Sequence, residues 1–391
     1  MAWASLRVVF KKELVDGSRD RRSMGTLLFS AVLAPLLIGV MFTVTAQRRR
    51  GADEIKLPIV GAEHAPAFVD WLKQQPGVEI VPSPGDAEQA VCDRIEDVVL
   101  IIDRDFAKNM SRATPAPVKL VSDVTRETAR PKVTRVRGLV AAYSGQTAAL
   151  RLIARGVAPS VATPIRIEEV EVSSSQQRLA TLLNILPMLL VIAAVTGSMQ
   201  VAIDSTAGER ERGSLEPLLL NPVPRLIVAA GKWLAASLFG CGAVIFSMVL
   251  TVNVMGRVPW HDMGIRFRVT DAELMSLLVL ILPLALLLSA FVMFASTFAR
   301  SFKEAQGYLG MVMLVPMLPG IAMTLYPLAK HPWLAPVPIL GQYALAADVL
   351  GGTPPSPALY VLAGVSALGV AGLLVGLTAR LLQRESIVFG R

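Results

Sequence analysis

The chain of 391 residues has little charge, few cysteines and few histidines, and each scarcity excludes a class of protein. Charged residues make up 17% of the chain and hydrophobic residues 53%, whereas a soluble domain usually carries about 25% charge. The two cysteines, Cys92 and Cys241, fall in regions of different character, so we expect no disulfide between them. With three scattered histidines, no His-Glu-x-x-His motif and no Cys/His cluster, the sequence indicates no metal site.

A phosphate-binding loop is also missing from the sequence. No Gly-x-x-x-x-Gly-Lys-[Ser/Thr] motif occurs, and the only Gly-Lys pair, Gly231–Lys232, is followed by Trp233 inside an apolar run. We therefore expect the chain to bind neither ATP nor magnesium directly. We also expect it to have no catalytic residues and no enzymatic activity of its own.

Long apolar runs, by contrast, are abundant. A bilayer crossing needs about 20 predominantly apolar residues. The runs that meet this length are 24–46, 179–203, 226–255, 273–299, 305–328 and 357–382. A seventh run, 333–350, is interrupted by Pro336 and Pro338 and is predicted to be a re-entrant or interfacial segment. The predicted fold class is a polytopic α-helical membrane protein with six transmembrane helices.

The net charge of +8 is distributed unevenly around these spans. Basic residues gather in residues 1–23, after the second and fourth spans, and in the tail. The positive-inside rule makes these segments cytoplasmic, so we predict a multi-pass protein of the cytoplasmic (inner) membrane with both termini in the cytosol. The charge thus indicates the lipid bilayer as partner, and no nucleic acid. Arg48, Arg49 and Arg50 oppose this orientation, but they begin a long segment, and long domains translocate largely regardless of charge.

Residues 1–23 precede the first span. Trp3, Leu6, Phe10 and Leu14 recur at spacings of three and four, which predicts a cytoplasmic amphipathic helix at the membrane interface. The alternative is that the basic residues only orient the first span. The span itself, 24–46, lacks a small-residue cleavage site and is too long for a signal peptide, so it is predicted to remain as an anchor.

Residues 47–178 have a different composition, with frequent charge and short apolar runs. Extended segments are expected at 55–60, 78–81, 98–102, 118–121 and 165–172, and helices at 65–74, 87–95 and about 128–155. This alternation predicts an inserted α/β domain. Because it lies between the first and second spans, the domain is predicted to be extracytoplasmic, and residues 179–391 are predicted to form a five-helix transmembrane region.

The predicted cytoplasmic loop 204–225 is dense in charge. Four alternating charges, Glu209–Arg212, precede a short apolar helix expected at Leu215–Leu220, with Ser214 in position to cap it. A capped apolar helix at the cytoplasmic face predicts a binding site for a partner. The alternative is that its leucines return to the bilayer interface.

Several polar residues fall inside the spans. Intramembrane polar groups are costly, and they tend to line a pathway or to bind neighbouring helices to one another. The candidate pathway residues are Asn184, Thr196, Ser198, Gln200, Asn253 and Ser296.

The charged loop resembles a known family. ERERGSLEPLL at 209–219, PVPR at 222–225 and GK at 231–232 are similar to the loop signature of type-2 (exporter-type) ABC transporter permeases, most of all the NatB-like sodium-export branch. RSFKEAQ at 300–306, KKEL at 11–14 and the layout of one span, a large outer domain and five further spans resemble the same branch.

The resemblance implies that the loop contains a coupling helix, which docks into a separate ABC ATPase subunit. The residues implied in this coupling are Glu209, Arg210, Glu211, Arg212, Gly213, Leu215, Glu216, Leu218, Leu219 and Arg225. It also implies two ATPase copies that supply ATP and magnesium, a second permease copy, most simply in a homodimer, and export by alternating access. The sequence leaves one alternative from another class open, a membrane-anchored sensor or scaffold whose outer domain binds a ligand.

Overall fold

The computed structural model describes residues 2–53, 55–83, 85–123, 125–126, 129–162, 183–263, 269–325 and 332–384. The chain forms two compact units, one of residues 1–42 with 173–391 and one of residues 43–172. The strand expected at 165–172 and the segment 326–331 lie outside the described residues. Each unit is described below by itself.

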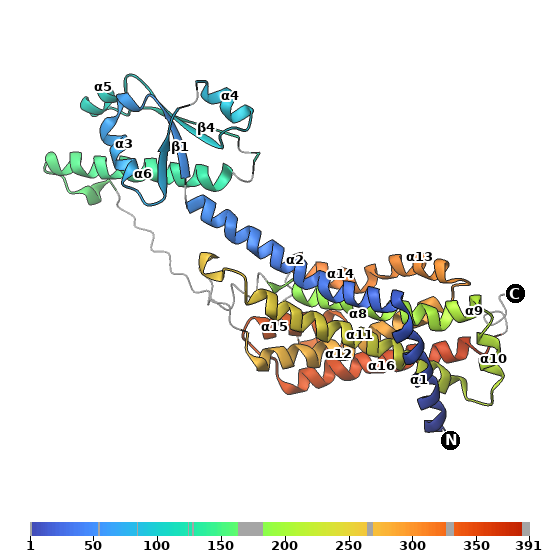
Figure 1. The fold of residues 1–391 in the computed structure, drawn as a ribbon. Helices are drawn as coiled ribbons and strands as arrows, with labels where there is room; N and C mark the ends of the chain where they lie inside the picture. The colour runs from blue at the N-terminus through green and yellow to red at the C-terminus, as the bar shows by residue number, and fades with distance from the viewer. Residues whose placement is uncertain are drawn as a thin grey trace. The chain divides into compact units, whose positions relative to one another are not determined.

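The first unit is a helical bundle (Figure 1). Its helices are α1 (Ala2–Arg19), the first part of α2 (Arg21–Asp53), α8 (Leu186–Ile203), α11 (Arg225–Met255), α12 (Asp271–Ser296), α13 (Phe302–Val312), α14 (Leu314–Leu325), α15 (Leu340–Leu350) and α16 (Pro357–Leu381). Within the described residues, six stretches are long and apolar enough to cross a membrane: Arg21–Gln47, Leu186–Glu211, Arg225–Met255, Asp271–Ser296, Phe302–Met323 and Pro357–Leu381. The prediction of a polytopic helical membrane protein is confirmed.

Small residues let the central helices approach closely. A Cβ added to Gly197 of α8 would lie 2.5 Å from the Cβ of Ala243 in α11. One added to Gly240 of α11 would lie 2.9 Å from the Ala194 carbonyl oxygen of α8. Close backbone approach at small residues is the usual basis of helix association in lipid, where no hydrophobic force acts between helices. The α8–α11 pair therefore forms the tightly packed centre of the bundle.

The segment predicted to be re-entrant or interfacial forms a short helix inside this unit. It begins with a 3₁₀ turn, η5 (Pro332–Leu334), and continues as α15, whose 11 residues span about 16 Å. That is too short for a hydrocarbon core of about 30 Å. The side chain of Gln342 is fully buried and donates to the Ala363 carbonyl of α16 at 2.9 Å.

The second unit is built on a four-stranded sheet in the order β2-β1-β3-β4. The strands are β1 (Ile55–Val60), β2 (Val78–Val81), β3 (Val98–Ile102) and β4 (Val118–Ser122); β1 runs parallel to β2 and β3, and β4 is antiparallel to β3. These are the four strands that the described part of the sequence predicted. The strand β3 is buried on both faces, which explains its unbroken apolar sequence.

Helices cover both faces of this sheet. The larger core joins the sheet to α3 (Pro66–Lys73), α5 (Phe106–Ser111) and α6 (Ala129–Ala154), and a smaller core joins it to α4 (Ala87–Cys92). Three of these helices were predicted, and the short α5 was not. Both cysteines are free, as expected.

Candidate coupling site

The second span does not end at residue 203, as the sequence suggested, but continues into the predicted loop. A π-helical turn, η3 (Asp204–Gly208), leads directly into α9 (Glu209–Glu211). Single π-turns inside helices occur often at functional sites. The helix ends at Gly213, whose φ of 67° is left-handed. Gly213 N donates to the Arg210 carbonyl and Ser214 N to the Glu209 carbonyl, both at 3.0 Å, which is the Schellman arrangement that glycine favours.

Glu209, the first residue of α9, lies in a buried cluster of charges. Its side chain is 3% exposed, and it pairs with Lys232 of α11 at 2.5 Å and with Lys12 of α1. Lys232, which is 1% exposed, also pairs at 2.8 Å with Glu13 of α1, which is 4% exposed. Lys12 closes the ring by pairing with Glu13 at 3.1 Å. Two lysines and two glutamates from three helices thus neutralise one another where an isolated charge would be costly.

Lys12 is the exposed member of this cluster. Partial burial alone would lower its pKa, but the carboxylates of Glu13 and Glu209 outweigh burial and raise the pKa above the ordinary value of lysine. Lys12 therefore stays charged throughout the physiological range.

Arg210 and Glu211 bind the segment that connects α12 to α13. The guanidinium of Arg210 donates to the Ala299 carbonyl at 2.6 Å and to the Thr297 carbonyl at 2.8 Å, directly after α12. Carbonyls at a helix C-terminus lack intrahelical partners, and an arginine supplies them. The carboxylate of Glu211 accepts from the backbone N–H of Phe302, the first residue of α13, at 2.7 Å.

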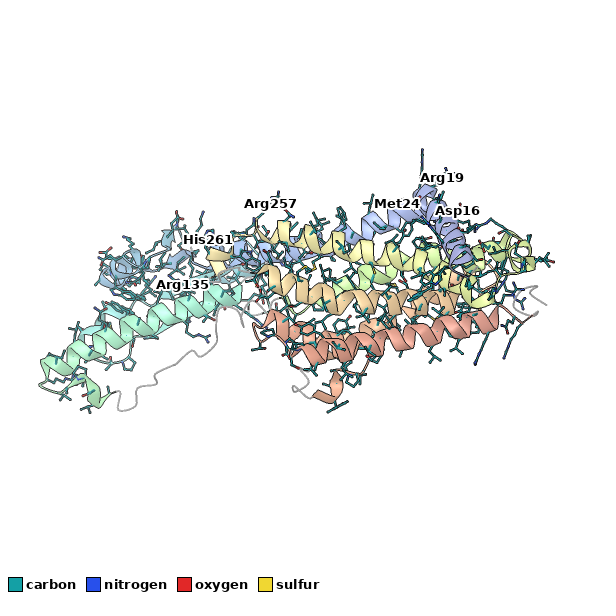
Figure 2. The ribbon with its side chains drawn as sticks, turned by 90° about the horizontal axis from the view of Figure 1, so that it is seen from below. Asp16, Arg19, Met24, Arg135, Arg257 and His261 are labelled. Atoms are coloured by element: carbon teal, nitrogen blue, oxygen red, sulfur yellow. The ribbon has the colours of Figure 1, made fainter. Side chains whose placement is uncertain are left out.

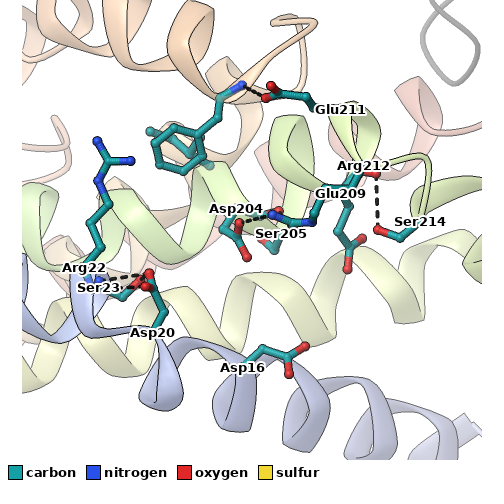
Figure 3. Close-up of polar contacts among 12 residues, drawn as sticks. Asp16, Asp20, Arg22, Ser23, Asp204, Ser205, Glu209, Glu211, Arg212 and Ser214 are labelled. Carbon is teal, nitrogen blue, oxygen red and sulfur yellow. Dashed lines mark hydrogen bonds and ion pairs between the residues drawn. The ribbon is translucent and has the colours of Figure 1, made fainter.

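Figure 3 shows how the last charge of the segment folds back on the π-turn. Arg212 donates to the Asp204 carboxylate at 2.7 Å, and this hydrogen bond raises the pKa of the guanidinium. On the neighbouring turn, the hydroxyls of Thr206 and Ser296 of α12 lie 2.7 Å apart. Each residue of Glu209–Arg212 therefore fixes a different part of the bundle.

The helix expected at Leu215–Leu220 is present as α10. The predicted cap is wrong, because Ser214 has helical backbone angles and its hydroxyl donates to the Glu209 carbonyl at 3.3 Å rather than capping α10. Leu215 is 2% exposed and belongs to the bundle interior, whereas Leu220 is 80% exposed.

The surface that α10 presents is therefore only part of the predicted set. Glu216 and Pro217 are exposed, Leu218 is half-buried, and the side chain of Leu219 lies outside the described residues. Arg225, half-buried, begins α11 after the turn that contains Pro222 and Pro224.

The sequence comparisons agree with this architecture. The family model described as "ABC-2 family transporter protein" matches residues 24–343. The chain belongs to the ABC-2 transporter family. It is also 29% identical over 325 residues, 80% of each chain, to "ABC transporter permease protein NatB" of Bacillus subtilis (strain 168). The resemblance to NatB-like ABC permeases is thereby confirmed, and an ATPase partner subunit follows from the family.

The most important residues of this ABC-2 permease that the sequence did not reveal are Lys12, Glu13 and Lys232. The sequence presented Lys232 as part of a failed phosphate-binding motif and of the family signature, with no indication of its buried partners. Its position inside an apolar span was nevertheless a signal, since a lysine there must find an acidic partner or leave the bilayer. Which carboxylates it finds depends on Glu13, 219 positions away, and no local pattern predicts that.

In the permease, α1 packs on the bundle through a face other than the apolar stripe that was predicted to lie at the membrane interface. Val9, Glu13 and Gly17 are its buried residues, whereas Trp3 is 84% exposed. Close approach explains the choice, because Val9 packs on Gly231, where an added Cβ would lie 2.7 Å away, and Gly17 packs on Phe239. The predicted stripe from Trp3 to Leu14 is therefore not the packing face.

The six candidate pathway residues of the permease are not brought together by hydrogen bonds among the described residues. Ser198 and Thr196 bond to carbonyls of their own helix, α8, and Asn253, which is exposed, bonds to its own helix, α11. Asn184, half-buried, lies in the turn before α8. Gln200 differs, because it is 3% exposed and its amide oxygen has no hydrogen-bond partner in the part of the chain that the structure describes.

Proposed function

We propose that this chain is the membrane subunit of an ATP-driven exporter, in which α10 docks on a separate ABC ATPase and Glu209–Arg212 transmits the motion of that ATPase. Family membership supports the first part. The observation that carries the second is that α9, directly before the exposed α10, is joined to α1, α11, the end of α12 and the start of α13.

These bonds suit transmission better than docking. A buried Glu209 cannot reach a partner protein, and the side chains of Arg210 and Glu211 form their hydrogen bonds with other residues of this chain. A displacement of α10 would instead move α9, and through it four other elements as one body. ATP would shift the equilibrium by binding more tightly to the state in which two ATPase copies are closed, since a ligand acts only through such a difference.

The orientation proposed is cytoplasmic for the end that carries α1 and α9, with residues 47–178 outside. Figure 2 shows Asp16 and Arg19 of α1 at one end of the bundle, with Arg257 and His261, which follow α11, at the other. We further propose that a second permease copy pairs with this one, which is supported by exposed apolar side chains such as Met311, Leu318 and Val365. The cargo proposed is sodium, and Gln200, with its unsatisfied buried oxygen, is the strongest candidate on the path.

Docking is tested by Leu220→Asp in the permease co-expressed with its ABC ATPase subunit. We expect the charge on an exposed leucine of α10 to abolish co-purification of the ATPase, while the permease stays in the membrane. Leu226→Asp makes the same change on another leucine that is 55% exposed, at the start of α11, and should leave co-purification intact. Equal recovery of the ATPase with both variants would refute docking through α10.

Transport is tested in proteoliposomes that contain permease and ATPase. If the protein is a sodium exporter, sodium should cross the membrane in an ATP-dependent manner. Gln200→Leu should slow this transport without loss of the bound ATPase. A complex that binds the ATPase but moves no sodium would exclude this cargo. The sensor reading would gain support only from a ligand of the second unit that changes partner recruitment without any transport.

A further inference from the structure

An apolar groove of about 660 Å³ opens between α1 and the two spans α11 and α12. Its walls include Trp3, Leu6 and Phe10 of α1 and Leu234 and Leu238 of α11. The volume lies within the range of roughly 300–1,000 Å³ that small-molecule sites occupy. The groove lies wholly within the first unit, and it is separate from the coupling cluster described above.

The groove is open because α1 touches α11 along a different line. That contact runs through Val9, Glu13 and Gly17, with Val9 on Gly231 and Gly17 on Phe239. Trp3, which precedes this contact line in α1, remains 84% exposed. The apolar stripe that the sequence assigned to the membrane interface thus becomes one wall of the groove, where tryptophan is typical of the headgroup level.

Two cations accompany this apolar surface. Arg7 lines the groove, and Lys11 lies one helical turn further on the same face of α1. Both are exposed, and neither forms an ion pair within the part of the chain that is described, in contrast to Lys12 beside them. An apolar slot next to unpaired positive charges, on a helix at a membrane surface, complements a molecule with a hydrocarbon chain and an anionic head.

We propose that this groove binds an anionic phospholipid of the bilayer, with an acyl chain between α1 and α11 and the phosphate beside Arg7 and Lys11. A second copy of the permease would fill an apolar groove without needing these cations, and a zwitterionic lipid would leave their charge unbalanced. The proposal is independent of ATPase docking. It has a consequence for the coupling site, because α1 also supplies Lys12 and Glu13 to the buried cluster, so the lipid acts on Glu209 through one helix.

Cys241 offers a direct probe, because it is half-buried and lines the same groove. Cys92→Ser leaves it as the only cysteine of the chain. The full-length variant is placed in nanodiscs of phosphatidylcholine alone or of phosphatidylcholine mixed with phosphatidylglycerol, and the rate of alkylation by a maleimide is measured. We expect several-fold slower alkylation in the discs that contain phosphatidylglycerol.

Equal rates in the two kinds of disc would overturn the proposal without any further variant. So would protection that appears in both lipids and only in discs holding two permeases, since that result assigns the groove to a second copy. Arg7→Gln/Lys11→Gln should remove the difference between the lipids. Arg19→Gln/Arg21→Gln takes the same charge from residues outside the groove and should preserve it.

A second measurement asks about retention of the lipid. Ala4 lines the groove, so Ala4→Trp should fill it and lower severalfold the phosphatidylglycerol that mass spectrometry finds bound to the purified permease. Val8→Trp adds the same ring to an exposed position of α1 that does not line the groove. Equal retention by the two variants would contradict the assignment.

Discussion

Removing one carboxylate from the buried cluster should destabilise the permease strongly, because it leaves a buried positive charge without its partner. In Glu209→Gln, Lys232 and Lys12 must share Glu13, and Lys232 is 1% exposed. Leaving a buried charge uncompensated costs about 3–5 kcal/mol. Lys232→Met costs a similar amount for the opposite reason, because Glu13 and Glu209 are then both buried with only Lys12 between them.

The double variant Glu209→Gln/Lys232→Met leaves the neutral pair of Lys12 and Glu13. Its cost should therefore fall short of the sum of the single costs, by up to about 3 kcal/mol for residues in direct contact. The free energies of unfolding are measured by titration with SDS in mixed micelles. A control cycle uses Arg212→Met and Asp204→Asn, whose side chains are 55% and 40% exposed and whose coupling should be about 0–1 kcal/mol.

Additive costs at Glu209 and Lys232, to within about 0.5 kcal/mol, would show that the two side chains are not coupled. They would mean that water or a flexible side chain already satisfies the charges, and that the cluster does not hold α9 to α11.

Three further changes follow from the same end of the bundle. Gly213→Ala should lower the free energy of unfolding by about 1–2 kcal/mol in the same titration, because the backbone φ of Gly213 is left-handed. Gly213→Asn should lower it less, because asparagine tolerates that backbone conformation. Equal losses of stability would mean that backbone strain is not the cause. Asp20 accepts from Arg22 N and Ser23 N at 3.0 Å before α2, so Asp20→Ala should cost about 1 kcal/mol, against no change for the exposed Asp93→Ala of the second unit. Burial would raise the pKa of Asp20, but the hydrogen bond from the Ser23 hydroxyl and the two backbone bonds outweigh burial and lower it. Its contribution to stability is therefore present above the unfolded pKa of about 3.9 and is lost as pH falls through the lower folded value; a loss already at neutral pH would contradict this. The pKa of Lys12 is raised, so its contribution is complete below the unfolded value of about 10.4 and is lost only as pH rises through the folded value; the cost of Lys12→Met should thus not vary between neutral and mildly alkaline pH.

The spans and the sheet were predictable because each rests on a local pattern. The apolar run 226–255 is long enough to cross a bilayer, so its length alone predicts a span. The strand β3 was predictable because its residues Val98–Ile102 are apolar without interruption. The site was only half predictable. The sequence located the charged segment and α10, but it placed Glu209 beside the docking surface rather than inside the bundle.

That difference has a physical cause. An alternating run of charges looks exposed, and only the tertiary partners Lys232 and Glu13 make burial of Glu209 possible. Gly213, likewise, gave no sign that it ends the span, because the helix before it contains a π-turn that no periodicity predicts. The missing information is non-local in both cases.

Arg210→Met separates the two proposed roles, transmission of motion by Glu209–Arg212 and docking by α10. The variant breaks the bonds to the carbonyls of Thr297 and Ala299 without touching the exposed face of α10. The decisive measurement is ATP-driven transport by the reconstituted complex beside the amount of ATPase that co-purifies. We expect the ATPase to be retained in full while transport is lost. Loss of the ATPase, or transport at the wild-type rate, would contradict this expectation.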